Sequence, residues 1–217
     1  MDFALNEEHL AAQKMVRDFA AKEVIPVIGE WDRKQQMNPA FLPRMAELGI
    51  LGISIPVRYG GQGFDYITLG LVCEELERAD TTLRVIMSVH MGLNSLSLLQ
   101  WGSEEQKQQY LVPLAQGDSF GAWGLTESQA GSDASGTRTN AVRSNGGWKV
   151  NGSKNFITHA IACNTLVAVA VTDKDKGNRG ISAFIFDKSM EGFRSDKKEN
   201  KLGMRASETA SVVFEDC

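Results

Sequence analysis

The hydrophobic pattern of the chain changes its period after Gly117, and this change constrains the fold more than any other feature. Before Gly117, apolar residues such as Leu10, Val16 and Phe19 recur at helical spacing. After it come short β-branched or aromatic runs bounded by turn residues, namely residues 139–143, 148–150, 166–172, 181–186 and 211–214. The chain is therefore predicted to be α+β, with an α-helical bundle domain at 1–117 and a β-barrel or β-sandwich-like domain at 118–217.

Several local signals refine this prediction. Ser103 with Gln106 forms a capping box for a helix that Pro113 is expected to help close. Residues 86–99 are apolar on most sides, which predicts a central, buried helix. Asn145-Gly146 predicts a hairpin turn, because both residues tolerate positive φ.

Charge and cysteine usage narrow the classes of function. The net charge is −4 with no basic run, which argues against nucleic acid or an anionic membrane as the partner. No stretch approaches the ~20 apolar residues of a membrane span. The three cysteines and three histidines lie at no disulfide or metal-ligand spacing, so we expect no metal and a cytoplasmic location.

The stretch F-G-A-W-G-L-T-E-S-Q-A-G-S-D, at residues 120–133, begins as an alternating apolar run and ends in small, hydroxyl and carboxylate residues. It predicts a strand that runs into a tight loop. Gly131 leaves the backbone open to a ligand, while Thr126 and Ser132 offer hydroxyl donors. Such a loop suits a phosphate or the edge of a heterocycle, and an ordinary polar turn has the same pattern. Glu127 and Asp133 are interpreted as loop-shaping groups.

The block W-G-L-T-E-S-Q-A-G-S-D, at residues 123–133, resembles the signature of the flavin-dependent acyl-CoA dehydrogenases. Further matches follow in the same order: N-G-S-K at 151–154, F-I-T at 156–158, residues 180–184 and K-L-G-M-R-A-S at 201–207. The resemblance starts at Met1-Asp2-Phe3 and covers the whole chain. It implies the amino-terminal helical and middle β domains of that fold. Since the chain stops directly after an apolar strand, we expect a carboxy-terminal helical domain to follow it.

The resemblance also implies FAD as the cofactor and a set of residues that bind it. Thr126 and Leu125 match positions at the flavin edge, and Thr158 matches a threonine near flavin N5. Phe156 stands where many members carry a tryptophan, and Ser128 replaces the usual proline; both are departures from the family pattern. The candidate cofactor-binding residues are Trp123, Leu125, Thr126, Gly131, Ser132, Phe156, Ile157 and Thr158.

The implied reaction introduces an α,β double bond into a short-chain acyl-CoA thioester, with hydride transfer to flavin N5. Electrons then pass to an electron-transferring flavoprotein, and family members are usually homotetramers. The catalytic base is expected in the carboxy-terminal domain, because no carboxylate of this chain matches it. Two alternatives remain open: an acyl-CoA oxidase, and a non-catalytic member that binds flavin or acyl-CoA.

The substrate is a separate question, on which residues 82–90 bear. They resemble the corresponding segment of glutaryl-CoA dehydrogenases, where an arginine and a serine one turn later face the distal carboxylate. This makes Arg84 and Ser88 candidate substrate-binding residues. Ser132, in the signature at 123–133, is a third candidate, because the resemblance implies a position near the bound thioester. Arg84 could equally cap a helix, pair with Glu75 or Glu77, or point to solvent.

Overall fold

The computed structural model describes residues 4–217, so Met1 to Phe3, where the resemblance begins, lie outside the described residues. Its contacts divide the chain into two units. One comprises Met1–Ser119 and Lys201–Ser207, and the other comprises Phe120–Asn200 and Glu208–Cys217. The sequence placed a boundary near Gly117; the segment Lys201–Ser207, which groups with the helical unit, had no signal in the hydrophobic pattern.

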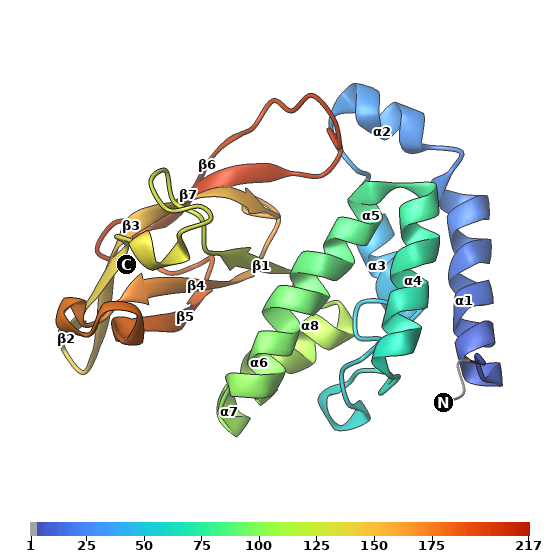
Figure 1. Ribbon diagram of the computed structural model, residues 1–217. Helices are drawn as coiled ribbons and strands as arrows, with labels where there is room; N and C mark the ends of the chain where they lie inside the picture. Colours follow the sequence, from blue (N-terminus) through green and yellow to red (C-terminus); the bar gives the residue numbers. More distant parts are fainter. Residues whose placement is uncertain (1–3) are drawn as a thin grey trace. The chain divides into compact units, whose positions relative to one another are not determined.

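The first unit is helical (Figure 1). Its α-helices are α1 (Glu7–Phe19), α2 (Ile28–Lys34), α3 (Phe41–Glu47), α4 (Tyr66–Ala79), α5 (Thr81–Ile86), α6 (Leu96–Trp101), α7 (Glu104–Gln106) and α8 (Val112–Gln116). A π-helical segment, Met87–Ser95, joins α5 to α6 without a break. Helices α1 and α4 lie side by side, and Arg17 of α1 binds the buried carboxylate of Glu75 of α4 at 2.6 Å.

Capping and burial explain where these helices begin and which of them are central. Ser103 and Gln106 form the predicted capping box of α7. The predicted buried helix at 86–99 is also present, and Met87 and Met91 are almost fully buried in it. The prediction for Pro113 was wrong, since the helix continues from α7 through the π-helical segment Lys107–Leu111 into α8, and Pro113 lies in the first turn of α8. The helix ends instead at Gly117, whose φ of 82° is left-handed.

The second unit is a mixed, seven-stranded sheet. Its strands are β1 (Gly121–Gly124), β2 (Asn140–Ser144), β3 (Gly147–Thr158), β4 (Thr165–Val171), β5 (Ile181–Asp187), β6 (Phe193–Lys198) and β7 (Thr209–Phe214). Their order is β1-β4-β2-β3-β7-β6, with β5 also paired to β4. β1 runs parallel to β4, and the predicted turn at Asn145-Gly146 joins β2 to β3 as an antiparallel hairpin.

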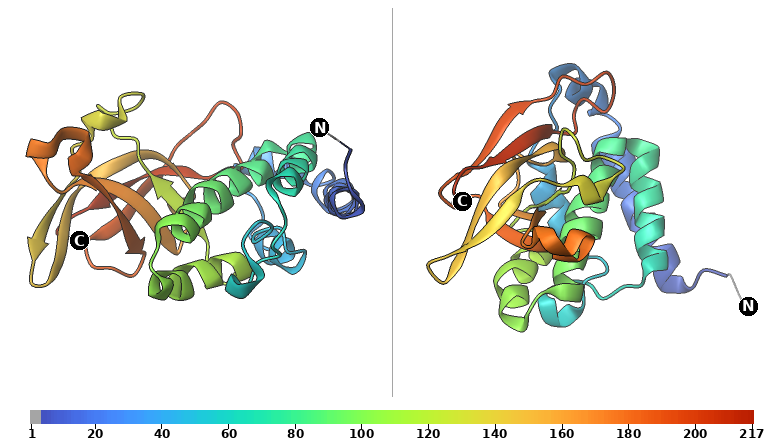
Figure 2. Two further views of the ribbon diagram at one scale, coloured as in Figure 1. Left: turned by 60° about the horizontal axis from the view of Figure 1, so that its bottom comes forward. Right: turned by 60° about the vertical axis from the view of Figure 1, so that its left-hand side comes forward.

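Strand β3 connects the two halves of the sheet and is much longer than the predicted 148–150. Its first part pairs with β2, and its second part pairs with β7 across a bulge between Lys154 and Ile157. The strands curl around an apolar core that includes Val150, Leu166, Phe186 and Phe214 (Figure 2). This arrangement confirms the predicted α+β class, with a curled, half-barrel sheet following the helices. Among residues 4–217, no helix combines the length and apolar character needed to cross a bilayer.

The fold makes a prediction about acid stability through His90. This residue is fully buried, Nε2 lies 3.2 Å from the Leu114 carbonyl oxygen, and burial lowers its pKa to about 4, against a usual value of 6.5. The unfolded state therefore takes up a proton more readily than the folded state as the pH falls below 6.5. Between pH 6.5 and pH 4 this linkage should remove about 3 kcal/mol of unfolding free energy.

His90→Gln keeps a similar size and an N–H donor but does not titrate. Denaturant unfolding at pH 7 and pH 4 should show the variant losing about 3 kcal/mol less than the wild type over this interval. An identical loss in both proteins would mean that His90 is not held neutral by the fold.

Candidate functional site

Strand β1 leads into the loop at residues 125–133, and Gly124 is the last residue before it. A Cβ on Gly124 would lie 2.9 Å from the Ala168 Cβ and 3.3 Å from the Lys154 Cγ. Glycine is therefore needed for β1 to pass close to β3 and β4. Immediately after it, Glu127 and Ala130 exchange two backbone hydrogen bonds of 2.9 and 3.1 Å, which close a tight turn.

Beneath this turn lies the most buried ion pair of the sheet unit. The Lys154 side chain is 0% exposed, and its Nζ lies 2.7 Å from Oε1 of Glu127. The ammonium also donates to the Thr137 hydroxyl at 3.0 Å and to the Leu125 carbonyl at 3.2 Å. An ammonium has three donors, and here it meets three acceptors.

The Glu127 carboxylate is equally well satisfied. It accepts from the backbone amides of Arg138 and Thr139 at 2.7 and 3.1 Å, from the Thr137 hydroxyl and from the side-chain amide of Gln129. Burial alone would raise the pKa of Glu127, but these donors and Lys154 outweigh burial and lower it. Burial lowers the pKa of Lys154, and the Glu127 charge opposes that shift. The loop-shaping interpretation of Glu127 is confirmed.

The segment Asn155-Phe156 lies against the same loop. The Asn155 amide donates to the Thr126 carbonyl at 2.7 Å, which brings Thr126 and Phe156 onto neighbouring segments. Phe156 sits in the bulge of β3 with a φ of 58°, and its side chain is 65% exposed. A bulky residue in the left-handed region costs about 1–3 kcal/mol, so both its backbone and its ring are held in an unfavourable state for the protein alone.

The candidate hydroxyl groups are unengaged. Within residues 4–217, the side-chain hydroxyls of Thr126, Ser132 and Thr158 make no hydrogen bond. Gly131 is exposed, and a Cβ built on it would meet no atom within 4 Å. The loop therefore presents donors and open backbone to its surroundings.

Two other candidates in this unit differ in what they can contribute. Trp123 is half-buried on β1, opposite Val167 of β4. Ile157 points into the apolar core and is 3% exposed, so only its backbone is available to a ligand. The bulge between Lys154 and Ile157 interrupts the regular alternation of β3, so Phe156 faces outward and Ile157 faces the core.

Arg84 and Ser88 belong to the helical unit. Nε of Arg84 lies 2.7 Å from the Glu77 carboxylate, and Nη1 donates to the Ser88 hydroxyl at 2.8 Å. The pairing with Glu77 was one of the alternatives in the sequence, and it is the one that the structure contains. Glu75, the other partner considered, binds Arg17 and Arg78 instead.

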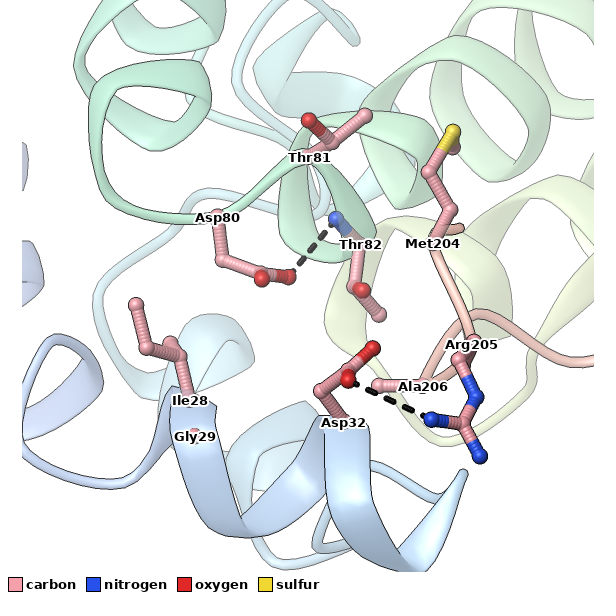
Figure 3. Close-up of a pocket in the computed structure, with 9 residues that line it drawn as sticks. All are labelled: Ile28, Gly29, Asp32, Asp80, Thr81, Thr82, Met204, Arg205 and Ala206. Atoms are coloured by element: carbon pink, nitrogen blue, oxygen red, sulfur yellow. Dashed lines mark hydrogen bonds and ion pairs between the residues drawn. The ribbon is translucent and has the colours of Figure 1, made fainter. Parts of the chain in front are cut away.

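The helical unit also contains a hollow of about 300 Å³, drawn in Figure 3. Its charged groups all have partners. Arg205 lies 3.6 Å from the Asp32 carboxylate, and the Asp80 carboxylate accepts from the backbone amide of Thr82 at the start of α5. None of its lining residues is a candidate from the sequence. In the described part of the chain, no group of acidic, histidine and cysteine side chains could hold a metal ion.

A second hollow of about 400 Å³ lies in the sheet unit and is lined partly by Arg138 and Lys174. It adjoins the Lys154–Glu127 pair through Thr137 and Arg138, which bind Glu127. Sequence reasoning missed both this hollow and the Lys154–Glu127 pair. The available signal was weak: a lysine in a strand whose neighbours alternate between core and solvent.

These observations fit a flavin. An isoalloxazine ring needs neutral donors and backbone at its edges and an apolar surface at its face. The loop offers free hydroxyls and open backbone, and the neighbouring segment of β3 adds the exposed ring of Phe156. The acidic residues of the loop do not conflict with this, because Lys154 neutralises Glu127 and Asp133 is exposed.

Comparison with known proteins extends these observations to the whole chain. The sequence profile described as acyl-CoA dehydrogenase, N-terminal domain, matches residues 6–118, and that of the middle domain matches residues 122–217. The short-chain specific acyl-CoA dehydrogenase of Clostridium acetobutylicum is 44% identical over 216 residues, which are 100% of this chain and 57% of that protein.

Two solved structures are similar over nearly all of the chain. Butyryl-CoA dehydrogenase from Megasphaera elsdenii has a TM-score of 0.96 and 39% identity, covering 100% of this chain and 57% of its own. A glutaryl-CoA dehydrogenase from Mycobacterium smegmatis, in complex with FADH2, has a TM-score of 0.92 and 32% identity, covering 98% and 53%. The chain thus spans a little over half the length of these relatives. With its full length matched by the first two domain profiles in order, the chain belongs to the acyl-CoA dehydrogenase family, which comprises FAD-dependent oxidoreductases acting on CH–CH donors.

Proposed function

We propose that this chain supplies the helical and middle domains of a short-chain acyl-CoA dehydrogenase. The observation that carries the proposal is Phe156, whose ring is exposed and whose backbone is held at positive φ beside the Thr126 loop. A protein without a ligand there gains nothing from this conformation. An aromatic cofactor laid against the ring would bury it.

Apart from Ile157, whose side chain lies in the core, each candidate in the sheet unit has a part in binding FAD or the thioester. The hydroxyls of Thr126 and Thr158 donate to polar atoms at the flavin edge, and the backbone of Leu125 contacts the same edge. Gly131 and Ser132 receive the pyrophosphate or the thioester, while Phe156 and Trp123 provide apolar surface. When bound, the flavin would accept the hydride that leaves the β carbon of the acyl-CoA.

Binding of the coenzyme A part of the substrate is proposed from charge. Coenzyme A carries phosphates, and the hollow lined by Arg138, Lys174 and Ser135 offers two cations and a hydroxyl within the sheet unit. We assign no catalytic base to this chain. An electron-transferring flavoprotein as acceptor and a homotetrameric assembly are part of the proposal through the family alone.

An uncharged short acyl chain is the substrate that Arg84 favours. Because Glu77 already neutralises its guanidinium, Arg84 does not require a carboxylate from the ligand. The similarity to short-chain specific relatives supports the same choice. A dicarboxylic acyl-CoA such as glutaryl-CoA remains a second candidate, because the Arg84–Ser88 pair has the groups to bind a distal carboxylate once Glu77 releases it.

The first test is an anaerobic titration of the complete encoded polypeptide with butyryl-CoA and, separately, with glutaryl-CoA. Butyryl-CoA should bleach the visible flavin band at lower concentration than glutaryl-CoA. Bound flavin that neither thioester bleaches would overturn the dehydrogenase proposal in favour of a non-catalytic binding protein. Sustained hydrogen peroxide formation in air would identify an oxidase instead.

A second prediction concerns the choice between the two thioesters. Glu77→Gln removes the charge that occupies Arg84, so the affinity for glutaryl-CoA relative to butyryl-CoA should rise about two- to fivefold. Glu74→Gln is the matched control, since Glu74 is exposed on the same helix and makes no contact with Arg84. An unchanged ratio in Glu77→Gln would show that Arg84 does not face the acyl chain.

A third prediction separates stability from cofactor binding at Phe156. Phe156→Gly and Phe156→Asn both relieve the positive φ, so the melting temperature of the apoprotein should stay constant or rise slightly. Both remove the ring, so FAD binding should weaken about three- to tenfold. Tyr66→Ala, which removes an exposed ring from α4, serves as the control and should leave FAD affinity unchanged. Wild-type affinity in both Phe156 variants would contradict the assignment.

A further inference from the structure

The Lys154–Glu127 pair lies under the loop that carries the candidate flavin contacts, and it touches three segments of the sheet unit at once. Lys154 is on β3, Glu127 and Leu125 are in the loop after β1, and Thr137 precedes β2. We propose that this pair is a clamp that sets the position of the Leu125–Thr126 edge, and that Lys154 is thereby a positioning residue for the flavin. The inference rests on the proposed function for its flavin part only.

Lys154 holds the loop through its bond to Leu125. Lys154 Nζ donates to the Leu125 carbonyl at 3.2 Å, directly beside the residue whose hydroxyl is free. Together with the 2.7 Å bond from the Asn155 amide to the Thr126 carbonyl, it fixes two successive peptide groups of the loop from strand β3. With their carbonyls held in this way, the Leu125–Thr126 backbone has a defined orientation.

Two glycines near the clamp leave the space that it needs. Gly124 leaves room for the Lys154 stem, as the 3.3 Å approach of its virtual Cβ shows. Gly152, two residues before Lys154, has a φ of 148°, and a Cβ there would lie 2.5 Å from the Thr139 hydroxyl oxygen. Both glycines let β3 come close enough for its lysine to reach the loop.

Apolar residues could fill the space that the ion pair occupies. A buried ion pair is rarely the most stable filling for such a space, since apolar residues of similar volume are often as good or better. What apolar residues cannot do is hold one carbonyl and two amides in fixed directions, as Lys154 and Glu127 do for Leu125, Arg138 and Thr139. The pair therefore contributes orientation, which matters to a ligand more than to the fold.

The test compares Lys154→Met, Glu127→Gln and the double variant in the complete encoded polypeptide. Lys149→Met is the matched control, because Lys149 lies on the same strand and makes an exposed pair with Asp216 at 3.7 Å. Three quantities are measured: the FAD dissociation constant of the apoprotein, its melting temperature, and hydrogen exchange of the amides at 127–130 and 137–139.

Each single variant leaves a buried group without its partner, so we expect a lower melting temperature, faster exchange and FAD binding at least about tenfold weaker. The double variant has no unpaired charge and should regain most of the melting temperature. It lacks the donor to Leu125, so FAD binding should stay at least about tenfold weaker. The control should match the wild type in all three measurements.

Recovery of wild-type FAD affinity in the double variant would overturn the proposal, because the pair would then act only on stability. Rapid exchange of the Arg138 and Thr139 amides in the wild-type apoprotein would also overturn it, and this measurement needs no variant. If the wild type bound no FAD, the proposed function would fail, while the exchange data would still decide whether the pair holds the loop.

Discussion

A lysine ammonium that is fully buried needs all three of its donors satisfied, and in this chain the three acceptors come from two segments, while the lysine itself lies on a third. The loop after β1, the segment before β2 and strand β3 must therefore meet at one point. Glu127 adds the amides of Arg138 and Thr139 to the same point. The geometry of the candidate flavin loop depends on this requirement more than on any turn propensity of its own residues.

The position of the Lys154–Glu127 pair is linked to the length of strand β3 and to its bulge. Strand β3 has to be long, because its first part pairs with β2 and its second part, which contains Lys154, pairs with β7. Its bulge follows directly, and it turns Phe156 outward while Ile157 enters the core. An exposed ring and a strained backbone at one residue are costly for the sheet alone, which is why we connect them with a bound cofactor.

In the helical unit, arginine side chains pair with carboxylates of the same unit. Arg17 and Glu75 join α1 to α4, and Arg84 is occupied by Glu77 and Ser88. An arginine that already pairs with a carboxylate of its own chain responds weakly to a charge on the ligand, because a second anion must compete with the first. This is the physical reason to favour an uncharged acyl chain over a dicarboxylic one.

The sequence by itself determined the class of the fold, the order of helices before strands, the Ser103 capping box and the Asn145-Gly146 turn. Each of these depends on residues close together in the chain, through hydrophobic period, caps or backbone preference. Its ordered motifs also identified the family. Only the tertiary structure decided the partner of Arg84, the opposite fates of Phe156 and Ile157, the true end of the helix past Pro113, the strand β6, and the Lys154–Glu127 clamp. Except for the helix end, these features depend on groups that are distant in sequence or on a bulge that shifts the alternation of a strand, and neither leaves a local signal. The helix end has a local cause, Gly117 in the left-handed conformation, but Pro113 is the stronger stop signal in the sequence.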